Sequence, residues 1–108
     1  MRRTPLYVAS AGLLLLASWP AAAAPHTYVV TIDKMKFGPL PGDLHKGDIL
    51  IWDNRDMFKH SATAGDHHSF DVDLPAGAKK KMVLSKSGTF PFFCRYHPGM
   101  RGTLTIGK

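Results

Sequence analysis

Glutamate is absent from this 108-residue chain, and cysteine occurs once, at Cys94. A single cysteine excludes an intrachain disulfide, so in an exported chain this thiol would be part of an intermolecular bridge, a reactive thiol or a metal ligand. The 8 acidic residues face 14 lysines and arginines, which gives a formal net charge of +6. No arginine-rich tract is present and the densest basic run, Lys79 to Lys81, is short, which argues against a nucleic-acid partner. The positive charge favours an acidic protein partner instead.

Long apolar runs are also absent, and the one near the N-terminus is short for a membrane span. The order there is positive charge, apolar run, break and small residues: Arg2 and Arg3, Leu6 to Ala17, Trp19-Pro20, and Ala21 to Ala24. This order is typical of a secretory signal. We predict cleavage after Ala23, so that residues 1–23 are a signal peptide and residues 24–108 form a periplasmic domain without a membrane span. An uncleaved membrane anchor is the alternative.

Helical signals are missing as well, because no window combines helical spacing with a cap. Glycine and proline turn signals instead interrupt the sequence at short intervals, and apolar residues alternate between them. Tyr28, Val30 and Ile32 share one face, and Ile49 to Trp52 is apolar on both faces, as in a central strand. This pattern predicts one all-β domain, a sandwich or a barrel. Residues 65–75 are the least regular part, and we expect a long connection there.

The residues with distinctive chemistry gather near the C-terminus. On a strand, Phe90, Phe92 and Cys94 face the same way, so the thiol ends an inward-facing aromatic row. The chain then turns at Pro98-Gly99, which places His97 and Met100 on a tight loop beside Cys94. A thiolate, an imidazole and a thioether therefore lie within seven residues. Such a short loop cannot surround a metal ion alone.

His60 is the best candidate for a second imidazole, because alternation puts it on one face with Phe58 and Ala62. Two histidines, one cysteine and a weak axial methionine are the ligand set of a blue-copper electron-transfer site. Four protein ligands leave no open position for a substrate, which argues against an enzyme. Two other methionines, Met35 and Met57, are interpreted as core residues.

The spacing Cys94-x-x-His97-x-x-Met100 resembles that of the cupredoxins, and its shortness is most similar to amicyanins. The likeness covers essentially all of residues 24–108 and is carried by these segments: Asp33 to Phe37, Gly47-Asp48, Ile51 to Arg55, Gly88 to Phe90, and Met100 to Gly102. The resemblance implies a Greek-key β-sandwich of seven or eight strands. It also implies one type 1 copper with His60, Cys94 and His97 as strong ligands and Met100 as the axial ligand. The implied activity is electron transfer from a dehydrogenase towards a cytochrome, and we expect the protein to be a monomer.

The chain departs from the amicyanin pattern around the ligands. Arg95 and Tyr96 replace a small residue and a proline, and Ser61 follows the first histidine where an asparagine is usual. Ser61 is a candidate for holding the Cys94 sulfur, through either its backbone N–H or its hydroxyl. His97 is the predicted entry or exit point for electrons. A copper carrier with little redox role is the main alternative function; an enzyme and a sandwich without metal rank below it.

Overall fold

The computed structural model describes residues 3–5, 12 and 24–108, and strands are its only regular elements there. The strands are β1 (Thr27–Asp33), β2 (Lys36–Phe37), β3 (Leu44–His45), β4 (Ile49–Asn54), β5 (His60–Ala64), β6 (Asp71–Leu74), β7 (Lys79–Val83), β8 (Gly88–Phe93) and β9 (Arg101–Gly107). In this part of the chain, no helix is long and apolar enough to cross a membrane. The predicted signal peptide, residues 1–23, falls almost wholly outside the described residues.

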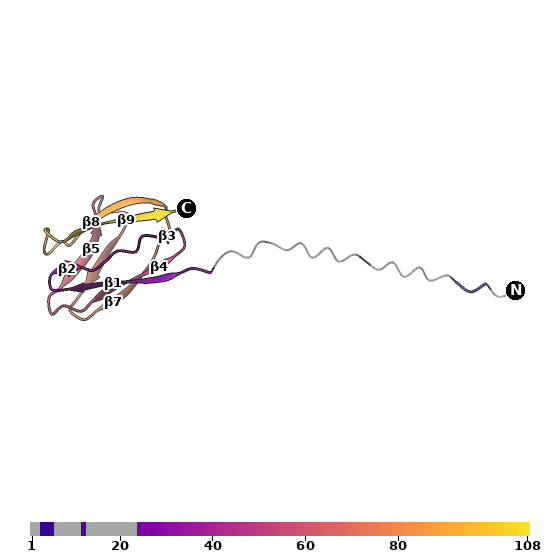
Figure 1. Ribbon diagram of the computed structural model, residues 1–108, viewed down its shortest axis with the longest axis horizontal. Coiled ribbons are helices and arrows are strands. Elements are labelled where there is room, and N and C mark those ends of the chain that lie inside the picture. The colour runs from indigo at the N-terminus through magenta and orange to yellow at the C-terminus, as the bar shows by residue number, and fades with distance from the viewer. Residues whose placement is uncertain (1–2, 6–11, 13–23) are drawn as a thin grey trace.

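Two sheets pack face to face as a sandwich (Figure 1). One sheet has the order β2-β1-β4-β7 and the other has the order β3-β9-β8-β5-β6. The chain changes sheet five times, between β2 and β3, β3 and β4, β4 and β5, β6 and β7, and β7 and β8, so most neighbours within a sheet are not consecutive in sequence. The all-β Greek-key sandwich is therefore confirmed. Its nine strands exceed the expected eight by one, because β2 and β3 are ladders of only two residues.

The core lies between the sheets and follows the alternation of the sequence. Val30 and Ile32 of β1 are buried, and Trp52 of β4 packs edge-on against Phe92 of β8 with ring centroids 5.3 Å apart. Phe37 adds a second edge-on contact to Phe92 at 4.8 Å. Aromatic pairs of this geometry stabilise a core beyond their buried area. Because Phe92 precedes Cys94 on the same face, this cluster supports the site from below.

Three local expectations were wrong. Residues 65–75 are not one long connection, since the edge strand β6 forms there by pairing with β5. Met57 is not a core residue, because 80% of it is exposed. Phe58 does not share the buried face of His60: β5 begins only at His60, and Phe58 is 51% exposed in the preceding connection. A period-two pattern holds only within a strand, so it fails where the strand has not yet begun.

The strand directions bring one set of ends together. β1 and β4 run parallel and β8 and β9 antiparallel, so the end of β4, the start of β5, the end of β8 and the start of β9 meet at one end of the sandwich. This end lies opposite the start of β1 and the C-terminus (Figure 1). His60 opens β5, and residues 94–100 form the loop between β8 and β9. The fold thus brings the predicted ligands to one place.

Candidate metal centre

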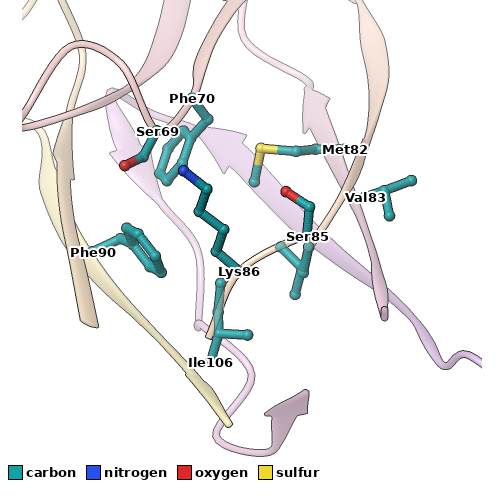
Figure 2. Close-up of a pocket in the computed structure, with 9 residues that line it drawn as sticks. Ser69, Phe70, Met82, Val83, Ser85, Lys86, Phe90 and Ile106 are labelled. Atoms are coloured by element: carbon teal, nitrogen blue, oxygen red, sulfur yellow. The ribbon is translucent and has the colours of Figure 1, made fainter. Parts of the chain in front are cut away.

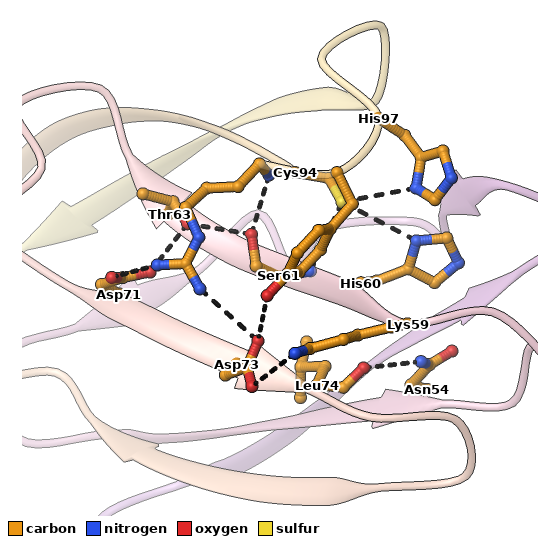
Figure 3. A network of polar contacts seen from close by, with 12 residues as sticks. Asn54, Lys59, His60, Ser61, Thr63, Asp71, Asp73, Leu74, Cys94 and His97 are labelled. Carbon is orange, nitrogen blue, oxygen red and sulfur yellow. Dashed lines mark hydrogen bonds and ion pairs between the residues drawn. The ribbon is translucent and has the colours of Figure 1, made fainter.

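Three potential metal ligands meet at this end of the sandwich (Figure 3). The ligand atoms of His60, Cys94 and His97 all lie within 4.8 Å of one another. Cys94 Sγ is 3.7 Å from Nδ1 of His60 and 3.8 Å from Nδ1 of His97. Cys94 and His60 are fully buried, whereas His97 is only partly buried. Both imidazoles therefore turn the same nitrogen towards the thiol, and one of the two rings reaches the surface.

The loop that carries three of the four candidates is closed by its own backbone. Cys94 N–H donates to the Met100 carbonyl at 3.0 Å, and Met100 N–H donates to the His97 carbonyl at 2.8 Å. His97 N–H donates back to the Cys94 carbonyl at 3.3 Å. Met100 itself is 6% exposed and belongs to the core cluster. These bonds hold the loop as a compact turn with Met100 beneath the surface.

His60 is oriented by Asp56. Nε2 of His60 lies 2.9 Å from Oδ2 of Asp56, and because a carboxylate can only accept, Nε2 is the protonated nitrogen. Nδ1 then offers its lone pair towards Cys94, as a metal ligand requires. The hydrogen bond from His60, with a second from Met35 N–H, lowers the pKa of Asp56 below its usual range. This role of Asp56 was not predicted, although its carboxylate stands only four residues before the histidine.

Ser61 contacts the site with both of its polar groups. Its backbone N–H lies 3.4 Å from Cys94 Sγ, and its hydroxyl accepts the Arg95 N–H at 2.8 Å. Of the two options left open by the sequence, the N–H is the group at the sulfur. The hydroxyl instead holds the first residue of the loop after Cys94.

Asn54 supports the connection that leads to His60. Its buried side-chain amide donates to the carbonyls of Phe58 and Leu74 at 2.9 and 3.0 Å, and its Oδ1 accepts the Asp56 N–H at 3.0 Å. One side chain thus ties the end of β4 to the segment before β5 and to the end of β6. This positioning role was also missed, because it depends on contacts between segments far apart in sequence.

The separations between the candidate ligands fit one metal ion. Two donor atoms bound at about 2.0 and 2.3 Å and separated by about 120° lie roughly 3.7 Å apart. Cys94 Sγ lies 3.7 and 3.8 Å from the two imidazole nitrogens, so a trigonal arrangement needs little movement. A trigonal set of one thiolate and two imidazoles with a weak thioether is the donor chemistry of type 1 copper.

A different part of the molecule also encloses space, but without such donors. A cavity of about 40 Å³ lies between the ends of β7, β8 and β9, where the Lys86 side chain crosses beside Phe70 and Phe90 (Figure 2). That volume is room for roughly two or three water molecules, far below that of a typical ligand site. Met82 is its one sulfur-bearing residue and no histidine or cysteine lines it. The thiol and the two imidazoles of the candidate centre lie at the opposite end of the sandwich.

The sequence pattern of the cupredoxin-like domain matches residues 6–106, nearly the whole chain. The chain belongs to the cupredoxin family. It is 29% identical to amicyanin from Paracoccus denitrificans over 91 residues, which is 80% of this chain and 70% of that protein. This cupredoxin is also similar in structure to a single-residue variant of amicyanin in its Cu(I) form. That comparison has a TM-score of 0.58 at 28% identity and covers 74% of this chain and 81% of the other.

A purple cupredoxin from Nitrosopumilus maritimus shares the fold at 20% identity, with a TM-score of 0.63 over 73% of this chain and 98% of the other. Family membership and the donor set agree that copper is the cofactor. They also agree on a small electron carrier rather than an enzyme, as the closed set of four candidate ligands suggests.

Proposed function

We propose that this cupredoxin binds one copper ion through His60, Cys94, His97 and Met100 and carries single electrons in the periplasm. The observation that supports this most directly is the meeting of one buried thiol and two imidazole nitrogens within 3.8 Å of it. Bound copper supplies a one-electron couple between Cu(II) and Cu(I). Soft sulfur ligands suit the reduced ion and imidazoles suit both, so one cage serves both states with little rearrangement.

The chain's own residues keep that cage rigid. Asp56 fixes the ring of His60, and the loop hydrogen bonds hold Cys94 and Met100 whatever the oxidation state. The Ser61 N–H near Cys94 Sγ stabilises negative charge on the sulfur. A site that moves little on reduction transfers electrons with a small reorganisation barrier.

His97 is the proposed point of electron entry and exit. It is the one ligand ring that is only partly buried, and it is flanked by exposed Tyr96, Pro98 and Gly99. Met57 and Phe58, on the connection to β5, are also exposed apolar residues, and the Lys59 ammonium that follows them lies over the Tyr96 ring at 4.9 Å. An apolar surface around an exposed ligand lets a partner approach the metal closely.

The proposed location and partners follow from the sequence. Residues 1–23 would be removed as a signal peptide, leaving a monomer with a formal charge of +4, since Arg2 and Arg3 are lost from the full-length +6. Its partners would be a dehydrogenase and a cytochrome with acidic docking surfaces. Association with such partners should slow as salt rises, because the Debye length shortens.

A visible spectrum after addition of Cu(II) and a mild oxidant tests the proposal. We expect an intense thiolate-to-copper band that disappears in Cys94→Ala and persists in Met35→Leu, a methionine outside the ligand set. A protein that binds Cu(I) tightly but shows no such band would indicate a copper carrier. Absence of copper binding in either state would contradict both functions.

A further inference from the structure

The two residues between Cys94 and His97 have long side chains that reach across to a neighbouring strand. Arg95 lies beside β6, where its guanidinium pairs with Asp71 and lies 3.4 Å from Oδ1 of Asp73. The Tyr96 hydroxyl donates to the same Asp73 oxygen at 2.9 Å. Both contacts span more than 20 residues of sequence and join the ligand loop to the edge strand of the sheet.

The Arg95 contacts close a ring of hydrogen bonds beside Cys94, through Ser61, Thr63 and Asp71 (Figure 3). Arg95 N–H donates to Ser61 Oγ, which lies 2.9 Å from the Thr63 hydroxyl. Thr63 in turn donates to Oδ1 of Asp71 at 2.8 Å, and the other oxygen of Asp71 binds the Arg95 guanidinium. Ser61 and Thr63 are buried, so this part of the ring is shielded from water.

Tyr96 is held on two sides. Besides its hydrogen bond to Asp73, its ring lies 4.9 Å from the Lys59 ammonium and 5.7 Å from the Arg95 guanidinium carbon. Lys59 Nζ also pairs with Asp73 at 3.4 Å. The loop is therefore attached to β6 and to the residue before His60 together.

We propose that Arg95 and Tyr96, with Asp71 and Asp73, form a clamp that keeps the Ser61 N–H on the Cys94 sulfur and so raises the reduction potential. This inference rests on the proposed copper site. Exposed ion pairs contribute little singly, but a closed network that includes buried hydroxyls resists distortion. The reduced site holds one more electron, so an N–H donor at the sulfur stabilises that state more.

Neutralising two residues of opposite charge distinguishes the clamp from a simple electrostatic effect on the reduction potential. Loss of the Arg95 charge lowers the potential by electrostatics alone, whereas loss of the Asp71 charge raises it. If both residues act through the clamp, Arg95→Gln and Asp71→Ala each lower the potential. The double variant should then resemble either single variant, because the ring is already open.

In each single variant we expect the ratio of Cu(II) affinity to Cu(I) affinity to rise three- to tenfold. This corresponds to a reduction potential roughly 30–60 mV lower, at 59 mV per tenfold. Tyr96→Phe alters no net charge, keeps the ring, and should shift the potential the same way by a smaller amount. Asp43→Ala removes an exposed carboxylate at the other end and serves as the control, with no shift expected. Opposite shifts in Arg95→Gln and Asp71→Ala, with no shift in Tyr96→Phe, would overturn the proposal.

A second measurement does not need copper. Amide hydrogen exchange of the metal-free protein should show the His97 and Met100 amides exchanging several-fold faster in Arg95→Gln and Tyr96→Phe, while the Trp52 amide in β4 is unchanged. Unchanged exchange rates of the His97 and Met100 amides in these two variants would contradict the clamp. A wild-type protein without the thiolate-to-copper band, but with exchange that responds to these substitutions, would contradict the copper function and leave the clamp standing.

Discussion

At the scale of single residues, the hydrogen bond between His60 and Asp56 decides which nitrogen faces the metal. The His60 ring is fully buried, and rotating it would break the 2.9 Å hydrogen bond from its Nε2–H to Oδ2 of Asp56. Partners of this kind fix the tautomer and raise the basicity of a histidine ligand.

Asp56→Ala should therefore weaken Cu(II) binding by about 10–100-fold, the usual effect of losing such a partner. Asp56→Asn retains an oxygen that accepts the same hydrogen bond and should lose much less affinity. Competition titration with a chelator of known affinity measures both. Equal losses in the two variants, or none in either, would show that Asp56 does not orient the ligand.

The structure brings His60, Cys94 and His97 together as the sequence predicted, but the residues that hold them in place were not predicted. Cys94, His97 and Met100 are close in sequence, and the turn at Pro98-Gly99 is a local signal, so their meeting followed from spacing. The assignment of the four ligands themselves stays a prediction. Asn54 and Asp71 act on segments some 20 residues away, and no local period reports which side chain faces them.

At the scale of elements, β7 is the edge of the four-stranded sheet and carries three consecutive lysines. Lys81 pairs with Ile51 and Lys79 with Asp53 on the outer face, next to the half-exposed Val83 and Val29. Charged side chains on an edge strand prevent pairing with the edge of another molecule. The three consecutive lysines of β7 thus have a structural explanation that does not depend on a binding partner.

Replacement of Lys79 and Lys81 by valine should make the protein associate, because it removes two charges from an edge strand and extends the apolar patch of Val29, Ile51 and Val83. Burying even part of one valine per chain lowers the concentration for association by at least about tenfold. Light scattering across a concentration series measures this, with Lys79→Arg and Lys81→Arg as the control. A valine variant that stays monomeric at every concentration reached by the wild type would show that the lysines are not needed there.

Elements that were predicted well are those whose burial follows a simple period. β1 and β4 alternate or run apolar, and both form as expected with Val30 and Trp52 inside. β6 was missed because its sequence, Asp71 to Leu74, is only four residues long and half of it is aspartate, a residue that strands disfavour. Its strand state comes from pairing with β5, a contact that its own sequence does not announce.

At the scale of the whole molecule, eight aspartates provide all the acidic side chains, and several are bonded only in the folded state. Asp48 is buried and accepts backbone N–H groups of His26 and His45 at 3.0 and 2.8 Å, which tie the chain before β1 to β3 and lower its pKa. In the loop after β5, hydrogen bonds from the Ser69 hydroxyl and from the backbone N–H groups of Ser69 and His68 lower the pKa of Asp66 to about 2.

A carboxyl whose pKa is lower in the folded state binds fewer protons there than in the unfolded chain at acidic pH. Its stabilising contribution is therefore complete above the unfolded pKa of about 3.9 and is lost as pH falls through the folded pKa.

We expect the free energy of unfolding of the metal-free protein to decline steeply between about pH 5 and pH 2. Urea unfolding at a series of pH values measures it. Asp48→Asn and Asp66→Asn should be less stable than wild type at pH 7 and should decline less on acidification, so that the curves converge near pH 2. Curves that stay parallel to the wild type would mean that these carboxylates do not carry the acid sensitivity, and that repulsion among the 14 basic residues and the histidines does.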